Sequence, residues 1–239
     1  MLTLLVYAVL GIFVLGFGRR LWIYARTPAP LLIPITPAPV TRLGVVVRMF
    51  REVVFFESLF KGDKWAWVGS YAFHGALALV LVRHIRYFCD PIPAFFAHFQ
   101  IVGILAGLAM VGGLGFLFLR RLIIDRVRYI SSPSDYLMLM LLIGIGVTGL
   151  AMTFIFRPDI VTIKEVMTNL FIGQSQAVLP SVSFGDTLFV VHLSLVGMLL
   201  VVFPFSKLMH MGGIFFCPTR NQVDNPREAR HVNPWAGKK

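Results

Sequence analysis

Acidic residues are scarce in this sequence, and so is charge of any kind. The 239 residues include 11 aspartates and glutamates against 22 lysines and arginines, and charged residues make up only 14% of the chain. A soluble domain carries about a quarter charged residues, whereas here apolar residues reach 57% and the mean hydropathy is +0.80. This composition excludes an ordinary soluble domain and indicates an integral membrane protein.

Cysteine is almost absent as well. Cys89 and Cys217 are the only two, and the sequence contains no C-x-x-C-H run. A cysteine-ligated iron–sulfur cluster and covalent haem attachment are therefore both excluded. The chain also has no nucleotide-binding motif and no internal repeat. A redox protein with these absences cannot complete a catalytic cycle alone.

Long apolar runs are what the sequence has in abundance. The apolar residues fall in blocks of about 20, the length that crosses about 30 Å of hydrocarbon as a helix. The first block has no positive residue before it and no cleavage site after it, so we expect a retained helix rather than a signal peptide. We predict an all-α membrane protein, a five-transmembrane-helix bundle with spans at Leu2–Tyr24, Trp65–Phe88, Phe95–Leu119, Tyr136–Phe156 and Thr187–Met209.

The basic residues predict the orientation of the bundle. Of the 22 lysines and arginines, 18 lie before the second span, between the third and fourth spans, or from Lys207 at the end of the fifth span onward. Such residues mark the cytoplasmic side of a membrane. The net charge of +11 could suggest binding to nucleic acid, but the distribution of the basic residues between the spans argues against it. We therefore expect an inner-membrane protein with its N-terminus outside and its C-terminus in the cytoplasm. Cys89 and Cys217 then lie at opposite faces.

Four segments outside the spans have patterns of their own. Thr27–Pro39 contains five prolines and is predicted to be an extended linker. Arg42–Phe60 is amphipathic, which is typical of a helix on the membrane surface, against a partner, or simply facing water. Ile160–Ile172 is predicted to cap the outer face. The tail beyond Gly212 is polar, so it is either disordered or docked on a cytoplasmic subunit.

Four histidines stand inside or at the ends of the predicted spans, where an ionisable residue is costly. His74 and His84 lie on the second span, and His192 and His210 on the fifth. A single membrane histidine is more often a packing residue than a ligand. These two spans run antiparallel, however, so His74 matches His210 in depth and His84 matches His192.

The spacing of these histidines suits two stacked sites. The helix-2 pair is separated by about 15 Å along the axis and the helix-5 pair by about 27 Å, or five full turns, so the fifth helix must bend or the cofactors must tilt. Pro204 supplies a cause for a bend. We predict two non-covalent, bis-histidine b haems. Zinc is a poor alternative because no carboxylate or thiolate completes a tetrahedron.

Three sequence runs resemble the cytochrome b (gamma) subunit of respiratory nitrate reductase and its relatives. They are Phe73-His74 followed by His84 and Arg86, then Arg126-Val-Arg128 before Ser134-Asp135, and finally His192-Leu193 leading through Phe203-Pro-Phe-Ser-Lys207 to His210. The likeness covers about Ala66–Arg220. The tail from Phe216 to Trp235 is most similar to the M subunits of DsrMKJOP complexes of sulfur-metabolising prokaryotes.

The resemblance implies a function and a set of partners. His74 and His210 would ligate an inner haem, and His84 and His192 an outer haem. The subunit would transfer electrons between quinone and a cytoplasmic iron–sulfur subunit (DsrK-like) within a complex of other Dsr subunits, as the quinone-reactive part of an oxidoreductase. The sequence itself predicts four regions: residues 1–26 (first helix), 27–64 (linker and amphipathic helix), 65–210 (four-helix haem-binding core) and 211–239 (cytoplasmic tail).

Further site residues are predicted on weaker grounds. In the family a lysine near the start of the third helix is linked to quinol; here His98 occupies that place and could bond a quinone or simply face water. Arginines could bind the haem propionates, although a cytoplasmic loop holds arginines in any case. The candidates are Arg83 and Arg86 for the outer haem and Arg126 and Arg128 for the inner haem. His231, in the tail, is predicted to have no redox role.

Rival functions remain at this stage. A proton-relaying transporter would need acidic partners within the helices and an inverted repeat, and neither is visible. A haem-free membrane anchor fits the basic face but leaves the matched histidines unexplained. The equivalent subunit of a nitrate reductase or of a heterodisulfide reductase-like complex is a third alternative.

Overall fold

The computed structural model describes residues 2–28, 37–89, 91–173 and 183–224, without the side chains of Ala97 and His98. All regular elements within these ranges are helices. Five helices are long and apolar enough to cross a membrane, as the block lengths predict. They are α1 (Leu2–Arg26), α4 (Lys64–His84) with the short 3-10 helix η1 (Ile85–Tyr87), α6 (Gln100–Ile123), α8 (Pro133–Phe154), and α10 (Phe184–Val202) with η2 (Phe203–Phe205).

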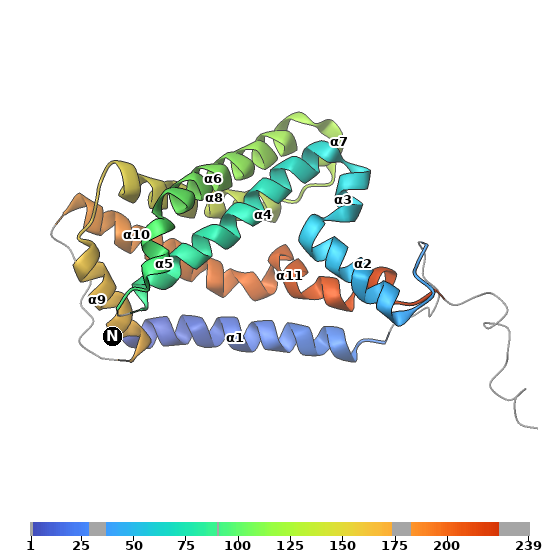
Figure 1. Ribbon diagram of the computed structural model, residues 1–239, viewed down its shortest axis with the longest axis horizontal. Helices are drawn as coiled ribbons and strands as arrows, with labels where there is room; N and C mark the ends of the chain where they lie inside the picture. Colours follow the sequence, from blue (N-terminus) through green and yellow to red (C-terminus); the bar gives the residue numbers. More distant parts are fainter. Residues whose placement is uncertain (1, 29–36, 90, 174–182, 225–239) are drawn as a thin grey trace, which may run out of the picture.

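The five long helices pack in an open arc (Figure 1). Helix α4 packs on α6, α6 on α8, α8 on α10, and α10 on α1. The core of the α4–α6–α8 side is formed by Phe73, Ala76, Ala106, Met110 and Leu114. Gly113 permits the close approach of α6 to α4, because a Cβ there would lie 3.1 Å from the Gly69 carbonyl oxygen. Helices α4 and α10 are not major packing neighbours.

One end of the bundle, which we call the α9 end, carries α9 (Ile160–Phe171) and the short α5 (Ala94–His98). The predicted amphipathic pattern is confirmed as α9, whose buried Ile163, Val166 and Leu170 pack with Phe189 of α10. Helix α9 therefore covers the ends of the spans on this side.

The opposite end, the α2 end, carries α2 (Arg42–Phe55), α3 (Glu57–Gly62) and α7 (Asp125–Tyr129) (Figure 1). The single helix expected over Arg42–Phe60 is wrong. Phe56 adopts a left-handed conformation with φ of 51°, which ends α2 and starts α3.

The chain after α10 folds back onto α2. It forms η3 (Lys207–Met209), α11 (His210–Gly213), η4 (Ile214–Phe216) and α12 (Pro218–Asn221). The side chain of Arg220 binds the buried Glu52 of α2 and the Ser58 hydroxyl of α3. The described part of the tail, as far as Asp224, thus docks on this chain itself, whereas residues 225–239, His231 among them, lie outside the described residues.

Two predicted helices are interrupted in the structure. The third span does not run on from Phe95, since α5 ends at His98 and α6 begins at Gln100. The fifth does not continue to Met209, since α10 ends at Val202. Pro204 has no N–H to donate to the Leu200 carbonyl, so one hydrogen bond of the α-helix is lost there and the helix is weakened at this point. The sequence predicts a bend at Pro204, and the structure shows a break there instead.

Side-chain caps begin three of the spans, and all three start earlier than predicted, α4 by a single residue. Ser132 with Asp135 and Ser183 with Asp186 form capping boxes at the starts of α8 and α10. Asp63 caps α4 by accepting the Ala66 amide, and this bond, together with the Arg120 guanidinium, holds the pKa of the Asp63 carboxyl below its usual value.

Candidate functional site

The structure brings the four membrane histidines together two by two. The imidazole centroids of His74 and His210 lie 6.0 Å apart with their planes at 84°. Those of His84 and His192 lie 6.5 Å apart with their planes at 11°. These are the pairs that matching depths predict, with the His74–His210 pair towards the α2 end and the His84–His192 pair towards the α9 end.

Each imidazole is oriented through its Nδ1 atom. For His74, His84 and His210 this atom lies 2.7, 2.7 and 2.9 Å from the carbonyl oxygens of Ser70, Val80 and Lys207. A carbonyl can only accept, so the proton belongs on Nδ1. Nε2 is then left with a free lone pair, which is the arrangement that binds a metal.

The fourth imidazole reaches the same tautomer through a hydroxyl. Nδ1 of His192 lies 2.9 Å from Oγ1 of Thr148. That hydroxyl donates its own proton to the Gly144 carbonyl at 2.8 Å. Oγ1 therefore accepts from Nδ1, and Nε2 of His192 also keeps its lone pair.

The two pairs fit an iron held between imidazoles. Metal–imidazole bonds of about 2.0 Å on either side of one ion put the two ring centroids roughly 6 Å apart. In the described part of the chain no group of three or more histidine, cysteine, aspartate or glutamate side chains could hold a metal ion. Two protein ligands per site suit an ion whose other ligands come from a macrocycle, so the donor set fits haem better than zinc.

The exposure of two of these histidines supports the same fit. His84, at the end of a membrane span, and His210, at the start of α11, are both exposed in the folded chain. Uncovered imidazoles at such positions are costly in lipid. A bound flat group between α4 and the α10–α11 segment would cover them.

Aromatic side chains surround the His74–His210 pair. The rings of Phe56 and Phe73 lie 5.1 and 4.7 Å from the His74 ring. Phe56 is also the residue with positive φ, a conformation that is an outlier for a bulky side chain. Glu52, by accepting the Ser58 amide, helps to hold the elbow at which Phe56 stands. The strained elbow thus places an aromatic wall beside His74.

Two arginines lie near the His84–His192 pair. The Arg86 guanidinium lies over the Tyr87 ring, 5.6 Å from its centroid, and the Tyr87 ring is 5.8 Å from that of His84. Arg83 lies across Gly103 of α6, where any Cβ would collide with it. Both arginines are half-buried, so both remain candidates for an anionic group at this site.

The other candidates are less closely placed. Arg126 and Arg128 lie exposed on α7, and Arg128 is paired with Asp125 at 2.7 Å. His98 ends α5 at the α9 end, but its side chain lies outside the described residues. The sequence analysis did not single out Arg120 and Arg121, which lie in the last turn of α6. Arg120 binds the carboxylate of Asp63, and Arg121 lies 3.6 Å from that of Asp135.

The break after α10 places His210. Gly16 of α1 lies against Pro204, and Arg20, one turn further along, donates from Nε to the Pro204 carbonyl at 3.2 Å. Ser206 is extended, with ψ of 174°, so His210 no longer follows the register of α10. The five-turn spacing expected between His192 and His210 is therefore wrong, and tertiary contacts place His210 instead.

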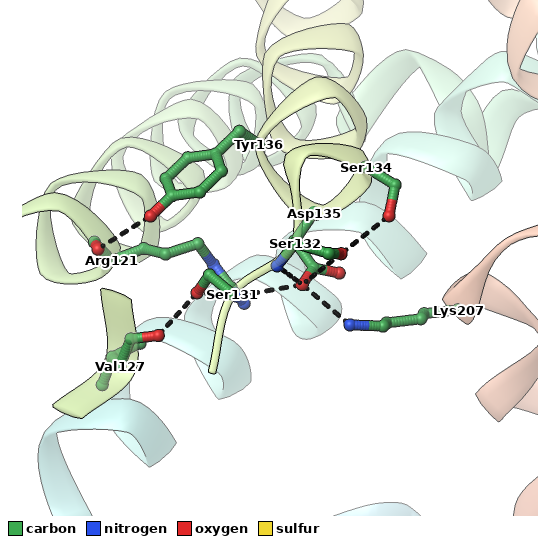
Figure 2. A network of polar contacts seen from close by, with 8 residues as sticks. All are labelled: Arg121, Val127, Ser131, Ser132, Ser134, Asp135, Tyr136 and Lys207. Carbon is green, nitrogen blue, oxygen red and sulfur yellow. Dashed lines mark hydrogen bonds and ion pairs between the residues drawn. The ribbon is translucent and has the colours of Figure 1, made fainter. Parts of the chain in front are cut away.

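A polar network joins α6, α7, α8 and η3 at the α2 end (Figure 2). Oδ2 of Asp135 accepts the amide and hydroxyl of Ser132 and the ammonium of Lys207, at 2.9, 3.0 and 2.7 Å. Arg121 donates to Ser131 at 2.7 Å and lies 3.6 Å from the same carboxylate oxygen. The S-x-x-D pattern of Ser132 and Asp135 could have predicted the cap. No local pattern predicts the contact with Lys207.

Comparison with known proteins places the chain in a family. Residues 40–226 match the family described as nitrate reductase gamma subunit, so the match begins ahead of Ala66, where the sequence runs suggested it would start. A cytochrome b-like subunit of an Hdr-like menaquinol oxidoreductase from Archaeoglobus fulgidus is 36% identical, over 96% of this chain and 81% of the relative.

Two further relatives support the same family assignment. The protein of the same description from Archaeoglobus profundus is 31% identical, over 96% of this chain and 80% of its own length. The nitrate reductase gamma chain of Bacillus subtilis is 28% identical, over 60% of this chain and 70% of its own length. On the extent of the family match and of these likenesses, the chain belongs to the nitrate reductase gamma subunit family.

Proposed function

We propose that the chain is the membrane cytochrome b subunit of a redox complex, and that it carries two b haems in series across the membrane. His74 and His210 bind one iron, and His84 and His192 bind the other. Haem b supplies reversible one-electron chemistry when bound, and the protein supplies ligands, spacing and electrostatics. The subunit transfers electrons between quinone and an iron–sulfur partner.

The observation that carries this proposal is the paired imidazoles. All four have Nδ1 hydrogen-bonded to an acceptor, and each faces its partner at about the separation that one bridging iron requires. Saturated coordination by two histidines suits electron transfer rather than oxygen chemistry. A structural anchor has no need of four imidazoles oriented in this way.

The relatives' names support the partners. Two of them are cytochrome b-like subunits of Hdr-like menaquinol oxidoreductases. We infer that this chain likewise serves a quinol of the menaquinol type and a complex with an iron–sulfur subunit related to heterodisulfide reductase. A more specific proposal is that the chain belongs to a DsrMKJOP complex and has a DsrK-like partner. This proposal rests on the sequence of the tail from Phe216 onward.

The two ends of the bundle have different roles in this proposal. The α2 end, with its excess of lysine and arginine, faces the cytoplasm and the iron–sulfur partner. The α9 end faces outward, with a quinone site near the His84–His192 pair to which His98 contributes. Arg83 and Arg86 bind propionates at this end, and Arg126 and Arg128 remain candidates at the other.

The test is a reduced-minus-oxidised spectrum of the purified complex with haem quantified per chain. Wild type is expected to hold two b haems. His84→Ala and His210→Ala should each lose one, because each removes one ligand of one pair. His231→Ala, in the tail, is the matched control and should keep both. A complex that assembles without haem would overturn the proposal and leave a membrane anchor.

A further inference from the structure

Two sequence runs far apart in the chain meet at the α2 end. The Ser134-Asp135 run opens α8, and Lys207 follows the break after α10. Nζ of Lys207 lies 2.7 Å from Oδ2 of Asp135 across 72 residues of sequence. Figure 2 shows the Lys207 side chain reaching from its own segment to the start of α8.

The main chain of Lys207 holds a histidine. Its carbonyl oxygen lies 2.9 Å from Nδ1 of His210 and also accepts the His210 backbone amide. One residue therefore binds Asp135 through its side chain and orients His210 through its backbone. The ion pair and the imidazole are therefore connected through the side chain and the carbonyl group of Lys207.

His210 needs such a restraint because no long helix holds it. Helix α10 ends at Val202, and Ser206 is extended. The intervening η2 and η3 are single turns, and α11 has only four residues. Short helices of this kind are marginal by themselves. By contrast, His74, His84 and His192 lie within helices of 19 or more residues.

The burial of the carboxylate makes this ion pair stronger than a surface pair. The Asp135 side chain is only 9% exposed, although that of Lys207 is 72% exposed. Solvent-exposed ion pairs contribute little because water competes for both charges. Water has little access to Asp135, so loss of Lys207 would leave this carboxylate with Arg121, at 3.6 Å, as its one charged partner among the described residues.

We propose that the Asp135–Lys207 ion pair is the positioning device for His210, and that it sets the orientation of this imidazole towards His74. The inference rests on the proposed function, in which these two histidines bind one iron. Lys207 and Asp135 are positioning residues, because neither touches the iron. The pair affects the His74–His210 site and leaves the His84–His192 site unchanged.

The chain offers a matched control in Lys61. Its side chain is 71% exposed and its Nζ lies 2.6 Å from Oε1 of Glu57, so the Lys61–Glu57 pair resembles the Lys207–Asp135 pair in length and exposure. In the part of the chain that the structure describes, no histidine bonds to the Lys61 carbonyl. Lys61→Met and Lys207→Met remove the same charge and the same kind of bond at the same end of the bundle.

The experiment compares Lys207→Met, Asp135→Asn, Lys207→Arg and Lys61→Met in the intact complex. The first readout is the electron paramagnetic resonance spectrum of the oxidised haems. This signal depends on the angle between the two axial imidazole planes, which differs between the sites at 84° and 11°. His210→Ala and His84→Ala assign each signal to its site. The second readout, amide hydrogen exchange across residues 203–213, can be measured whether or not haem is bound.

Lys207→Met and Asp135→Asn are expected to shift or abolish the signal of the His74–His210 site and to speed exchange in residues 203–213. The other signal should stay unchanged, which shows that the protein is folded. Lys207→Arg should restore the first signal, because arginine can reach Asp135. Lys61→Met should match wild type in both readouts.

Other results would overturn the inference. Lys207→Met behaving like Lys61→Met would show that the ion pair positions nothing. Midpoint potentials that shift in opposite directions in Lys207→Met and Asp135→Asn, with unchanged resonance signals and exchange, would show an effect of charge alone. Absence of haem from wild type would defeat the proposed function, and hydrogen exchange would still test whether the ion pair holds the His210 segment.

Discussion

At the scale of single residues, the site depends on what each Nδ1 atom contacts. The sequence predicts which four histidines to consider and how they pair, because span boundaries and helix direction follow from hydrophobic block length. It does not predict their acceptors. Three are backbone carbonyls, and Thr148 contacts His192 across 44 residues of sequence. A tertiary contact of this kind has no local pattern.

Thr148 offers a test of the Nδ1 contact with its own control on the same helix. Thr148→Val removes the acceptor for His192, so we expect the His84–His192 site to bind haem about 10–100-fold more weakly. Among the described residues, the Thr153 hydroxyl bonds only the Gly149 carbonyl one turn back, and Thr153→Val should keep both haems. Haem content per chain after dilution or competition with apomyoglobin measures the difference. Equal haem retention in the two variants would contradict a role for the Thr148 hydroxyl.

At the scale of elements, the sequence predicts regular helices well and their interruptions poorly. All five spans are predicted because apolar length alone identifies them. The elbow at Phe56 was missed because the pattern from Arg42 to Phe60 continues through it, and a left-handed phenylalanine is uncommon. Pro204 signals an interruption, but only packing against α1 decides that α10 ends there instead of kinking.

Helix α1 supports that interruption through one small residue. A Cβ at Gly16 would lie 2.8 Å from Pro204, whereas a Cβ at Gly11 would meet nothing within 4 Å. Gly16→Leu should push α1 away from Pro204, weaken the Arg20 bond to its carbonyl and destabilise the fold by about 1–3 kcal/mol. Gly11→Leu should be close to neutral. Thermal unfolding in detergent compares the two variants, and equal melting temperatures would show that the α1 contact is loose.

At the scale of the whole molecule, the arc of helices separates two different ends. The histidines face each other between α4 and the α10–α11 segment, which are brought together through α6 and α8 rather than by direct packing. The α2 end carries the elbow, the Asp135 network and the described tail, while the α9 end carries α9 and α5. The sequence could predict this division from the distribution of charge. It could not predict that Arg220 docks the tail on the chain's own Glu52, because that contact depends on the fold of both segments.

The orientation of the two ends can be tested with the two native cysteines. Cys89 follows η1 at the α9 end, and Cys217 precedes α12 at the α2 end; both are free and partly exposed. If basic residues hold the α2 end in the cytoplasm, a membrane-impermeant maleimide should label Cys217→Ala protein, which retains Cys89, in intact spheroplasts. Cys89→Ala protein, which retains Cys217, should be labelled only after permeabilisation, and the double variant gives the background. The reverse pattern would place the α2 end and the proposed iron–sulfur partner outside, so that the proposed quinone site near the His84–His192 pair would exchange its protons with the cytoplasm.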